Sequence, residues 1–535
     1  MKHEQAGDSI KYVEPLILKQ WMHDGRDIGV IDVREHGQYG EQHLFYAVNL
    51  PYSRLEADAW RLIPNLKARV VLIDEDGLDV AASSAHRLQE LGYTNVHVLH
   101  GGIQNWIVQG LTVFAGVNVP SKAFGEIAEE VFHTPHISAM DLHRKQQAGE
   151  KLVILDGRPY QEYQKMNIPG SVCCPNGELA LYIDELVPDD KTTIVINCAG
   201  RTRSIIGAQT LLNLQIKNPV YALENGTQGW MLADLKLDHG SSRSWKKARL
   251  DADLSSKRQR AKRLFEKYQI ETVDQEQVRR WCNDDARTVF LLDVRDPQEC
   301  KDAGVAGFFN APGGQLIQAT DQYVGVRNAR LVLLDTDGVR APVVASWLWM
   351  QGWEVYVMTH DAGQDIALTR NVKAHLKDQS INEVSADQVS MLISRGYKVF
   401  DLRSSADYRK GHLESASWTI RPKFTETFTK SGNPEKLLLV GSDIATLEIA
   451  THDFHLLGAT DIVAYAGDMT ALENLGCKLL STPDLPADEE RIDYLFFVHD
   501  RHDGNKEAAK RYLSWELGLV AQLDESEKNV YRISG

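Results

Sequence analysis

The sequence predicts an α/β protein made of four tandem domains, each with a small, mostly parallel sheet flanked by helices. First, a chain of 535 residues is long enough for three or four domains. Second, continuous apolar runs alternate with helix-like segments, which is typical of parallel sheets covered on both faces. Third, the triplet Asp-x-Arg follows an apolar run four times at intervals of domain size, beginning at Asp32, Asp156, Asp293 and Asp401.

Each triplet is followed by the same series of segments. A second apolar run comes first, then a helix-like stretch, and then a short β-branched run. The second runs read "RVVLIDEDG", "TTIVINCAG", "ARLVLLDTDG" and "KLLLVGSDI". We therefore expect four domains that occupy residues 10–118, 130–240, 268–365 and 380–480.

The connecting segments are polar. Residues 239–269 are rich in basic side chains and are predicted to form a linker that turns into a helix. The polar segment 481–493 marks the end of the fourth domain, and residues 485–535 are counted as a C-terminal tail. The tail is predicted to contain a strand, a helix and a short strand, and it is a candidate cap on the last domain.

Composition excludes several functional classes. The net charge of -15 argues against general binding to nucleic acid or to an anionic membrane surface. The N-terminal segment is polar and no run reaches 18 apolar residues, so neither a signal peptide nor a membrane span is expected. Six cysteines without paired C-x-x-C spacing fit a reducing cytoplasm and predict no metal site. No organic cofactor is predicted either.

One cysteine has surroundings that suit a nucleophile. Cys198 ends the apolar run in "VINCAGRTRS", and a helix-like segment follows it. A helix start offers unpaired N–H groups and partial positive charge, and Gly200 lets the loop curl so that such groups point inward. Arg201 and Arg203 add full positive charges, which favour the thiolate over the thiol. Cys198 is therefore the candidate nucleophile rather than an inert buried thiol.

These residues carry a resemblance to a known family. The loop "CAGRTR", the Asp-x-Arg triplet with "MNIPGSVCCP" after it, and the closing motif "ENGTQGW" resemble the rhodanese (sulfurtransferase) family. The first repeat keeps a similar closing motif, "HGGIQNW", whereas the last two repeats lack it. The resemblance implies four rhodanese-like modules, each a doubly wound sheet with its active loop at the carboxyl end of a central strand.

The resemblance also implies a reaction. A rhodanese moves sulfane sulfur from thiosulfate to cyanide or a thiol acceptor through a cysteine persulfide, which Cys198 would carry here without a metal or cofactor. Loops with glycine and serine in place of the two arginines are typical of related mercaptopyruvate enzymes, so thiosulfate is the expected donor. The expected donor-binding residues are Arg201, Arg203, Ala199, Gly200, Thr202 and Arg158.

The other three modules are predicted to be inactive. Alignment of the loops places Glu75, Thr336 and Ser442 opposite Cys198 to within one residue, and no cysteine lies in these three loops at either register. The Asp-x-Arg triplets also occur in these modules, which favours an ion pair that holds the fold. Arg158 therefore ranks below the two loop arginines as a donor-binding residue.

Two other functional classes have partial support in the sequence. A Cys-dependent phosphatase or arsenate reductase needs Cys-x5-Arg, but Ser204 stands where that arginine is required. A sulfur-relay or scaffold protein would use the modules for binding, and the acceptor would distinguish it from a small-molecule enzyme. The sequence leaves the oligomeric state open, a homo-oligomer included.

The remaining candidate residues have simpler interpretations. Cys173 and Cys174 are predicted to pack in the core, with a resolving thiol for Cys198 as the alternative. The segment "HDRHDG" at 499–504 is predicted to be a solvated turn, with a metal site as the alternative. The other three cysteines are predicted to be structural: Cys282, Cys300 and Cys477.

Overall fold

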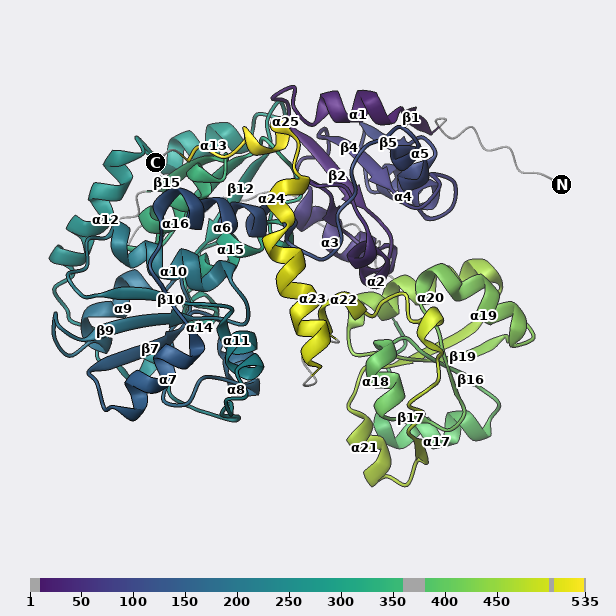
Figure 1. Ribbon diagram of the computed structural model, residues 1–535. Coiled ribbons are helices and arrows are strands. Elements are labelled where there is room, and N and C mark those ends of the chain that lie inside the picture. Colours follow the sequence, from purple (N-terminus) through teal and green to yellow (C-terminus); the bar gives the residue numbers. More distant parts are fainter. Residues whose placement is uncertain (1–9, 359–380, 500–504, 534–535) are drawn as a thin grey trace. The chain divides into compact units, whose positions relative to one another are not determined.

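The computed structural model describes residues 10–358, 381–499 and 505–533 (Figure 1). It contains four mostly parallel sheets, and we call the segments around them modules 1 to 4 in chain order. The described residues fall into two compact units: modules 1 and 4 form one within 1–21, 29–116 and 372–496, and modules 2 and 3 form the other within 22–28, 117–371 and 497–535. The exact module boundaries stay a prediction.

Module 1 has a five-stranded sheet in the order β1-β5-β4-β2-β3. Its strands are β1 (Lys11–Val13), β2 (Ile28–Asp32), β3 (Val48–Asn49), β4 (Arg69–Ile73) and β5 (Val96–Leu99). Its helices are α1 (Pro15–Trp21), α2 (His36–Glu41), α3 (Leu55–Leu62), α4 (Val80–Glu90) and α5 (Gly102–Val108). The strand that ends at the triplet, β2, is therefore an inner one, next to β4, which leads into α4.

Module 2 repeats this order as β6-β10-β9-β7-β8. Its strands are β6 (His136–Ile137), β7 (Leu152–Asp156), β8 (Val172–Cys173), β9 (Thr193–Asn197) and β10 (Val220–Leu223). Its helices are α6 (Val119–Phe132), α7 (Ala139–Gln147), α8 (Tyr160–Lys165), α9 (Leu179–Leu186), α10 (Thr202–Asn213) and α11 (Gly226–Leu232). Ile194 and Ile196 of β9 pack in one apolar cluster and Val195 in another, because side chains alternate across a strand.

Module 3 has the order β11-β15-β14-β12-β13. Its strands are β11 (Glu271–Val273), β12 (Val289–Asp293), β13 (Phe309–Asn310), β14 (Arg330–Leu334) and β15 (Glu354–Met358). Its helices are α12 (Ser255–Lys267), α13 (Gln275–Cys282), α14 (Pro297–Asp302), α15 (Gly313–Gln318) and α16 (Arg340–Met350). The basic linker after module 2 turns into α12, as predicted, and α12 packs against α16.

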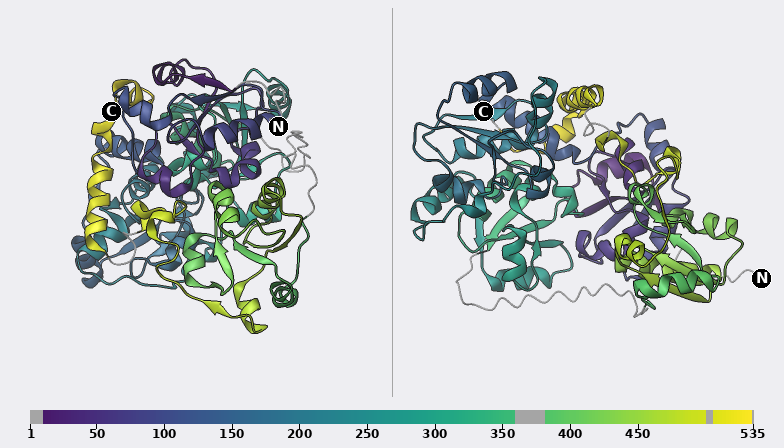
Figure 2. Two further views of the ribbon diagram at one scale, coloured as in Figure 1. Left: turned by 90° about the vertical axis from the view of Figure 1, so that its right-hand side faces the viewer. Right: turned by 90° about the horizontal axis from the view of Figure 1, so that it is seen from below.

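Module 4 has a four-stranded sheet in the order β18-β16-β19-β20. Its strands are β16 (Lys398–Asp401), β18 (Ala416–Trp418), β19 (Lys436–Val440) and β20 (Asp461–Tyr465), with a short antiparallel pair of β17 (His412–Leu413) and β21 (Leu479–Leu480). Its helices are α17 (Ala386–Ser394), α18 (Ser405–Lys410), α19 (Phe424–Lys430), α20 (Ile444–Leu457) and α21 (Met469–Asn474). Figure 2 shows helices on both faces of the sheets.

The C-terminal tail differs from the prediction. Its described part holds only helices, and the two predicted strands are absent from it. These helices are α22 (Phe496–His499), α23 (Lys506–Leu517), α24 (Leu519–Gln522) and α25 (Glu525–Lys528). Ala509, Tyr512 and Glu516 are buried at helical spacing, so α23 docks one face rather than extending a sheet.

The tail also packs on a different module from the one expected. Residues 497–535 belong to the unit of modules 2 and 3, not to that of module 4. The Tyr531 hydroxyl donates to the Pro120 carbonyl of module 2 at 2.7 Å, and the Arg532 N–H donates to the Met350 carbonyl of module 3 at 2.8 Å. Helices α23 and α24 lie against α6 (Figure 1). The described helices include none that is long and apolar enough to cross a membrane.

Candidate functional site

Cys198 lies directly after the last residue of β9, at the carboxyl edge of the module 2 sheet. Its side chain is buried, with 2% of its surface exposed. In the neighbouring strand Asp156 pairs with Asn197, and the Asn197 amide donates to the Asp156 carboxylate at 3.0 Å. The Ser204 hydroxyl, from the first turn of α10, donates to the Cys198 sulfur at 3.1 Å. The thiol therefore has a hydrogen-bond donor at the start of the following helix.

The closing motif "ENGTQGW" fixes the backbone of the active loop. The N–H of Thr227 donates to the Cys198 carbonyl at 2.8 Å, and the N–H of Gln228 donates to the Ala199 carbonyl at 3.1 Å. Gly226 has a φ of +52°, and a Cβ built there would lie 2.2 Å from the Cys198 carbonyl oxygen. Only glycine permits this close approach between α11 and the loop.

Both loop arginines are bound by carboxylates. Arg201 donates from Nε and Nη2 to Glu126 of α6 at 2.8 and 2.9 Å, and it also pairs with Glu129. Arg203 forms a two-pronged pair with Glu162 of α8 at 2.9 and 2.8 Å. Burial opposes the charge of Arg201, but the hydrogen bonds and charge of Glu126 outweigh it and raise the pKa of the guanidinium. Donor binding by these two arginines stays a prediction.

The ion pair predicted for the Asp-x-Arg triplets is present in all four modules. Arg158 donates from Nε and Nη2 to Asp156 at 2.8 and 2.7 Å, and from Nη2 to the Met166 carbonyl at 2.6 Å. Each of the other pairs has the same two-pronged form: Arg34 with Asp32, Arg295 with Asp293, and Arg403 with Asp401. A role for Arg158 in donor binding stays a prediction.

The structure corrects the alignment of the four loops by one residue. The N–H after each triplet aspartate donates to the last residue of the neighbouring strand: Asn197, Ile73, Leu334 or Val440. The residues that follow these strand ends are therefore equivalent, and they are Cys198, Asp74, Asp335 and Gly441. The alignment by apolar runs falls one residue later, at Glu75, Thr336 and Ser442, because the polar Asn197 is still paired in β9 after the apolar run has ended. None of the corrected matches is a cysteine either.

In modules 1 and 3 the position of Cys198 is filled by a buried carboxylate that accepts loop N–H groups. Asp74 accepts from the N–H of Gly77 at 2.6 Å and of Ala81 at 2.8 Å. Asp335 accepts from the N–H groups of Gly338 and Ala341 at 2.9 and 2.7 Å. Burial raises the pKa of Asp335 to about 7, with the nearby Asp337 charge adding to the effect. In both modules the loop N–H groups thus converge on the side chain at this position.

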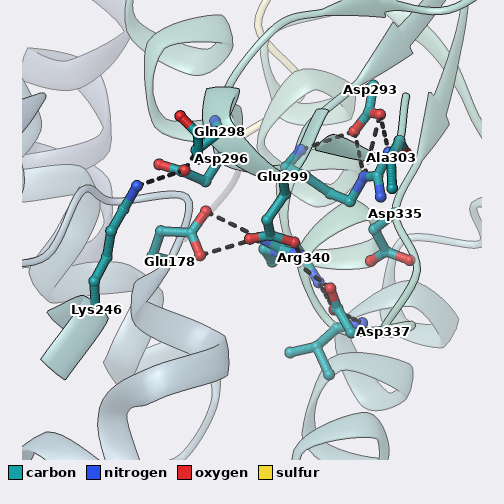
Figure 3. Close-up of polar contacts among 12 residues, drawn as sticks. Glu178, Lys246, Asp293, Asp296, Gln298, Glu299, Ala303, Asp335, Asp337 and Arg340 are labelled. Carbon is teal, nitrogen blue, oxygen red and sulfur yellow. Dashed lines mark hydrogen bonds and ion pairs between the residues drawn. The ribbon is translucent and has the colours of Figure 1, made fainter. Parts of the chain in front are cut away.

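Module 3 also keeps one of the two arginine pairs of the active loop (Figure 3). Arg340 binds Glu299 in two-pronged fashion at 2.8 Å for both contacts, as Arg203 binds Glu162. Arg340 also binds Glu178 of module 2 at 3.1 Å. A pair that persists in a module without a cysteine supports a positioning role for its counterpart in module 2.

The C-terminal tail covers the active loop at Gly200. The Thr202 hydroxyl donates to Glu516 of α23 at 3.1 Å, and Glu516 is buried. A Cβ at Gly200 would lie 3.1 Å from Glu516 Oε2 and 3.7 Å from Tyr512 Cε1. Gly200 is not among the glycines with positive φ. Its lack of a side chain therefore serves the close approach of the tail, whereas the sequence suggested a role in curling the loop.

Cys173 and Cys174 lie in the core of module 2. Cys173 and Cys174 are fully buried, and burial raises the pKa of both thiols, which disfavours their thiolates. This supports the packing interpretation over a resolving thiol. The described residues contain no cluster of ligands that could hold a metal ion, and residues 500–504 of the segment "HDRHDG" lie outside them.

Comparison with known proteins identifies the family. The family model of the rhodanese-like domain matches residues 14–109 and 138–233. The solved structure of a thiosulfate sulfurtransferase from Pseudomonas aeruginosa superposes with a TM-score of 0.88 at 35% identity, over 98% of this chain and 99% of that one. The chain belongs to the rhodanese family. The match over the whole length extends the rhodanese assignment to the two modules that the family model leaves unmatched.

Two curated proteins resemble parts of this rhodanese. A helix-turn-helix-type transcriptional regulator from Mycobacterium tuberculosis is 33% identical over 116 residues, which are 21% of this chain and 50% of the regulator. A Bacillus subtilis protein with the provisional name of a sulfur carrier is 32% identical over 103 residues, which are 19% of this chain and 54% of that protein. The chain thus spans about half the length of the curated relatives that it matches.

Loss of the tail contact at Tyr512 should expose the active loop. In Tyr512→Ala we expect iodoacetamide to alkylate Cys198 faster and the amides of residues 199–204 to exchange hydrogen faster, because the aromatic cover beside Gly200 is gone. Lys510→Ala, on the exposed face of the same helix, is the matched control and should leave both rates unchanged. Equal rates in Tyr512→Ala and the wild type would contradict a covering role for the tail.

Proposed function

We propose that this rhodanese transfers sulfane sulfur from thiosulfate to cyanide or a thiol acceptor, with Cys198 as the persulfide carrier. One observation carries the proposal: Cys198 stands at the position where modules 1 and 3 hold a carboxylate bound by loop N–H groups. A loop whose N–H groups converge on an acceptor at this position suits a thiolate or a persulfide. The likeness to a thiosulfate sulfurtransferase over nearly the full chain supports the same reaction class.

The reaction consists of two displacements at sulfur. The Cys198 thiolate attacks the outer sulfur of thiosulfate, the bond between the two thiosulfate sulfur atoms breaks, and sulfite leaves with the electron pair. Cys198 now carries a persulfide anion. Cyanide then attacks the terminal sulfur, thiocyanate leaves, and the thiolate is restored. Charge balances in both steps, and neither step needs an oxidant or a reductant.

Different donors of the loop stabilise the two sulfur atoms of the persulfide in this proposal. The Ser204 hydroxyl donates to the sulfur of Cys198 and thereby stabilises its anionic form. The backbone N–H of Arg201 stands three residues after Cys198 in the sequence, as the N–H groups of Gly77 and Gly338 stand three residues after the aspartates that they bind in modules 1 and 3. We assign this N–H to the terminal sulfur of the persulfide.

A sulfur-relay protein is the second candidate function. The likeness to the Bacillus subtilis protein named as a sulfur carrier favours it, as do the three modules without a cysteine at the corresponding position. A relay would load Cys198 in the same way but pass the sulfur to a protein thiol. The acceptor distinguishes the two functions: a relay should pass the sulfur to a protein thiol even when cyanide competes, whereas a pure scaffold should show no turnover with thiosulfate and cyanide.

The carrier residue can be tested directly. After incubation with thiosulfate, the wild-type chain should gain one sulfur atom at Cys198 by mass spectrometry, and Cys198→Ser should gain none and lose cyanide turnover. The fold should persist, because serine and cysteine have nearly the same size. Cys300→Ser, a substitution in module 3, is the control and should behave like the wild type. Sulfur on another cysteine of Cys198→Ser would refute the assignment.

The role of Arg203 can be separated from direct donor binding. We expect Arg203→Ala and Glu162→Ala each to lower kcat/KM for thiosulfate, and the double variant to be no worse than the single ones, because the pair acts as a unit on the loop. Additive losses would contradict this expectation. They would indicate that Arg203 contacts thiosulfate directly, and such a charge-assisted hydrogen bond is worth roughly 1.5–3 kcal/mol.

The modules without a cysteine should not be rescued by one substitution. In a Cys198→Ser background, Asp335→Cys should give a kcat/KM at least about tenfold below that of the wild type, because burial at this position opposes a charged group and the Asp337 carboxylate adds to the effect. A rise of one unit in the thiol pKa already lowers the thiolate population about tenfold. Thiocyanate formation is the measurement. A rate equal to that of the native site would show that module 3 lacks only the cysteine.

A further inference from the structure

In module 1 the side chain of Glu75 occupies an anion-binding arrangement formed by two other side chains. The carboxylate of Glu75 lies in the loop after β4, one residue beyond the position of Cys198 in module 2. Arg34 donates from Nη1 to Glu75 Oε2 at 3.3 Å, and Gln104 of α5 donates from its side-chain amide to Glu75 Oε1. Arg34 also keeps its pair with Asp32. One arginine of the triplet thus holds two carboxylates at once.

Module 2 has the same arrangement without the carboxylate. The N–H of Gln104 donates to the Glu75 carbonyl at 3.1 Å, and that of Gln228 donates to the Ala199 carbonyl at 3.1 Å. These matching bonds make Gln228 the counterpart of Gln104 and Ala199 the counterpart of Glu75. Arg158 is the counterpart of Arg34, but Ala199 offers it no acceptor.

The counterparts in module 2, Gln228 and Arg158, have polar atoms without a hydrogen-bond partner among the described residues. The Gln228 side chain is 5% exposed, yet within the described part of the chain neither its oxygen nor its nitrogen has a hydrogen-bond partner. Arg158 uses Nε and Nη2 for Asp156 and the Met166 carbonyl, and its Nη1 makes no hydrogen bond among the described residues. Buried polar groups are nearly always paired, so an unpaired buried amide beside a nucleophile points to a ligand.

We propose that Arg158 and Gln228 form the subsite for the oxyanion half of the sulfur donor. This inference rests on the proposed function. The sulfonate group of thiosulfate would occupy the place that the Glu75 carboxylate occupies in module 1, and sulfite would remain there after the transfer. The short side chain of Ala199 carries no anion into this place, and the neighbouring Cys198 would attack the outer sulfur of a donor held there.

The charge of Arg158 is available to such a donor despite its pair with Asp156. Arg34 shows that the same arginine geometry accepts a second anion through Nη1 while Nε and Nη2 stay on the aspartate. Arg201 and Arg203, by contrast, each meet a glutamate in two-pronged fashion. Donor specificity therefore rests on the triplet arginine and the glutamine of the closing motif.

Filling the subsite with a carboxylate tests the proposal. Ala199→Glu should reproduce the internal anion of module 1 and lower the rate of sulfur loading from thiosulfate by about ten- to a hundredfold. Cys198 should still react with iodoacetamide, which is uncharged and does not need the subsite. Ala199→Gln has the same size without the charge, and it should retain clearly more loading than Ala199→Glu. Equal loading in the two variants, or loading of Ala199→Glu at the wild-type rate, would overturn the subsite.

Substitution of Gln228 tests the subsite through binding constants rather than through the loading rate. Gln228→Ala should raise the KM for thiosulfate and the inhibition constant of sulfite by the same factor, about three- to tenfold for one neutral hydrogen bond, with little change in kcat. Gln104→Ala, the matched change in module 1, should leave both constants unchanged. An unaltered sulfite inhibition constant in Gln228→Ala would overturn the subsite. If the wild-type chain took up no sulfur at Cys198, the proposed function itself would fail, and the subsite with it.

Discussion

The buried ion pair of the Asp-x-Arg triplet is the constraint on which each module depends. In module 2, Asp156 ends the strand β7 with no exposed surface, and Arg158 turns back to bind it and the Met166 carbonyl eight residues further on. The pair therefore ties the strand to the far end of α8. Breaking a buried pair leaves an uncompensated charge and costs roughly 3–5 kcal/mol, so all four modules keep both partners.

The modules differ chemically at one position, the residue after the second strand of each. The residue after the second strand is Cys198 in module 2, and it is an aspartate in modules 1 and 3. The aspartates accept N–H groups of their own loops, whereas Cys198 is the proposed carrier of the transferred sulfur. The same position therefore anchors the loop in two modules and is the proposed reactive site in a third.

Local patterns predicted much of this arrangement because local physical effects produce it. Alternating apolar and helical segments are enough to indicate parallel sheets, and a glycine- and arginine-rich stretch after a strand indicates a loop at its carboxyl end. The error of one residue at Glu75 has a simple cause. Hydrogen bonds between strands, not apolar character, define where a strand ends, and the polar Asn197 of module 2 is still paired after the apolar run has ended, whereas the run of module 1 ends at its last strand residue, Ile73.

The sequence by itself determined the repeated α/β plan, the ion pairs of the triplets and the single cysteine at a strand end. Only the tertiary structure decided which groups surround that cysteine. Arg201 meets Glu126, and Thr202 meets Glu516, 314 positions away. The apolar stripe of α23 indicates that the helix buries one face, but it carries no information on the partner. That choice depends on the fit between surfaces that exist only after the modules have folded.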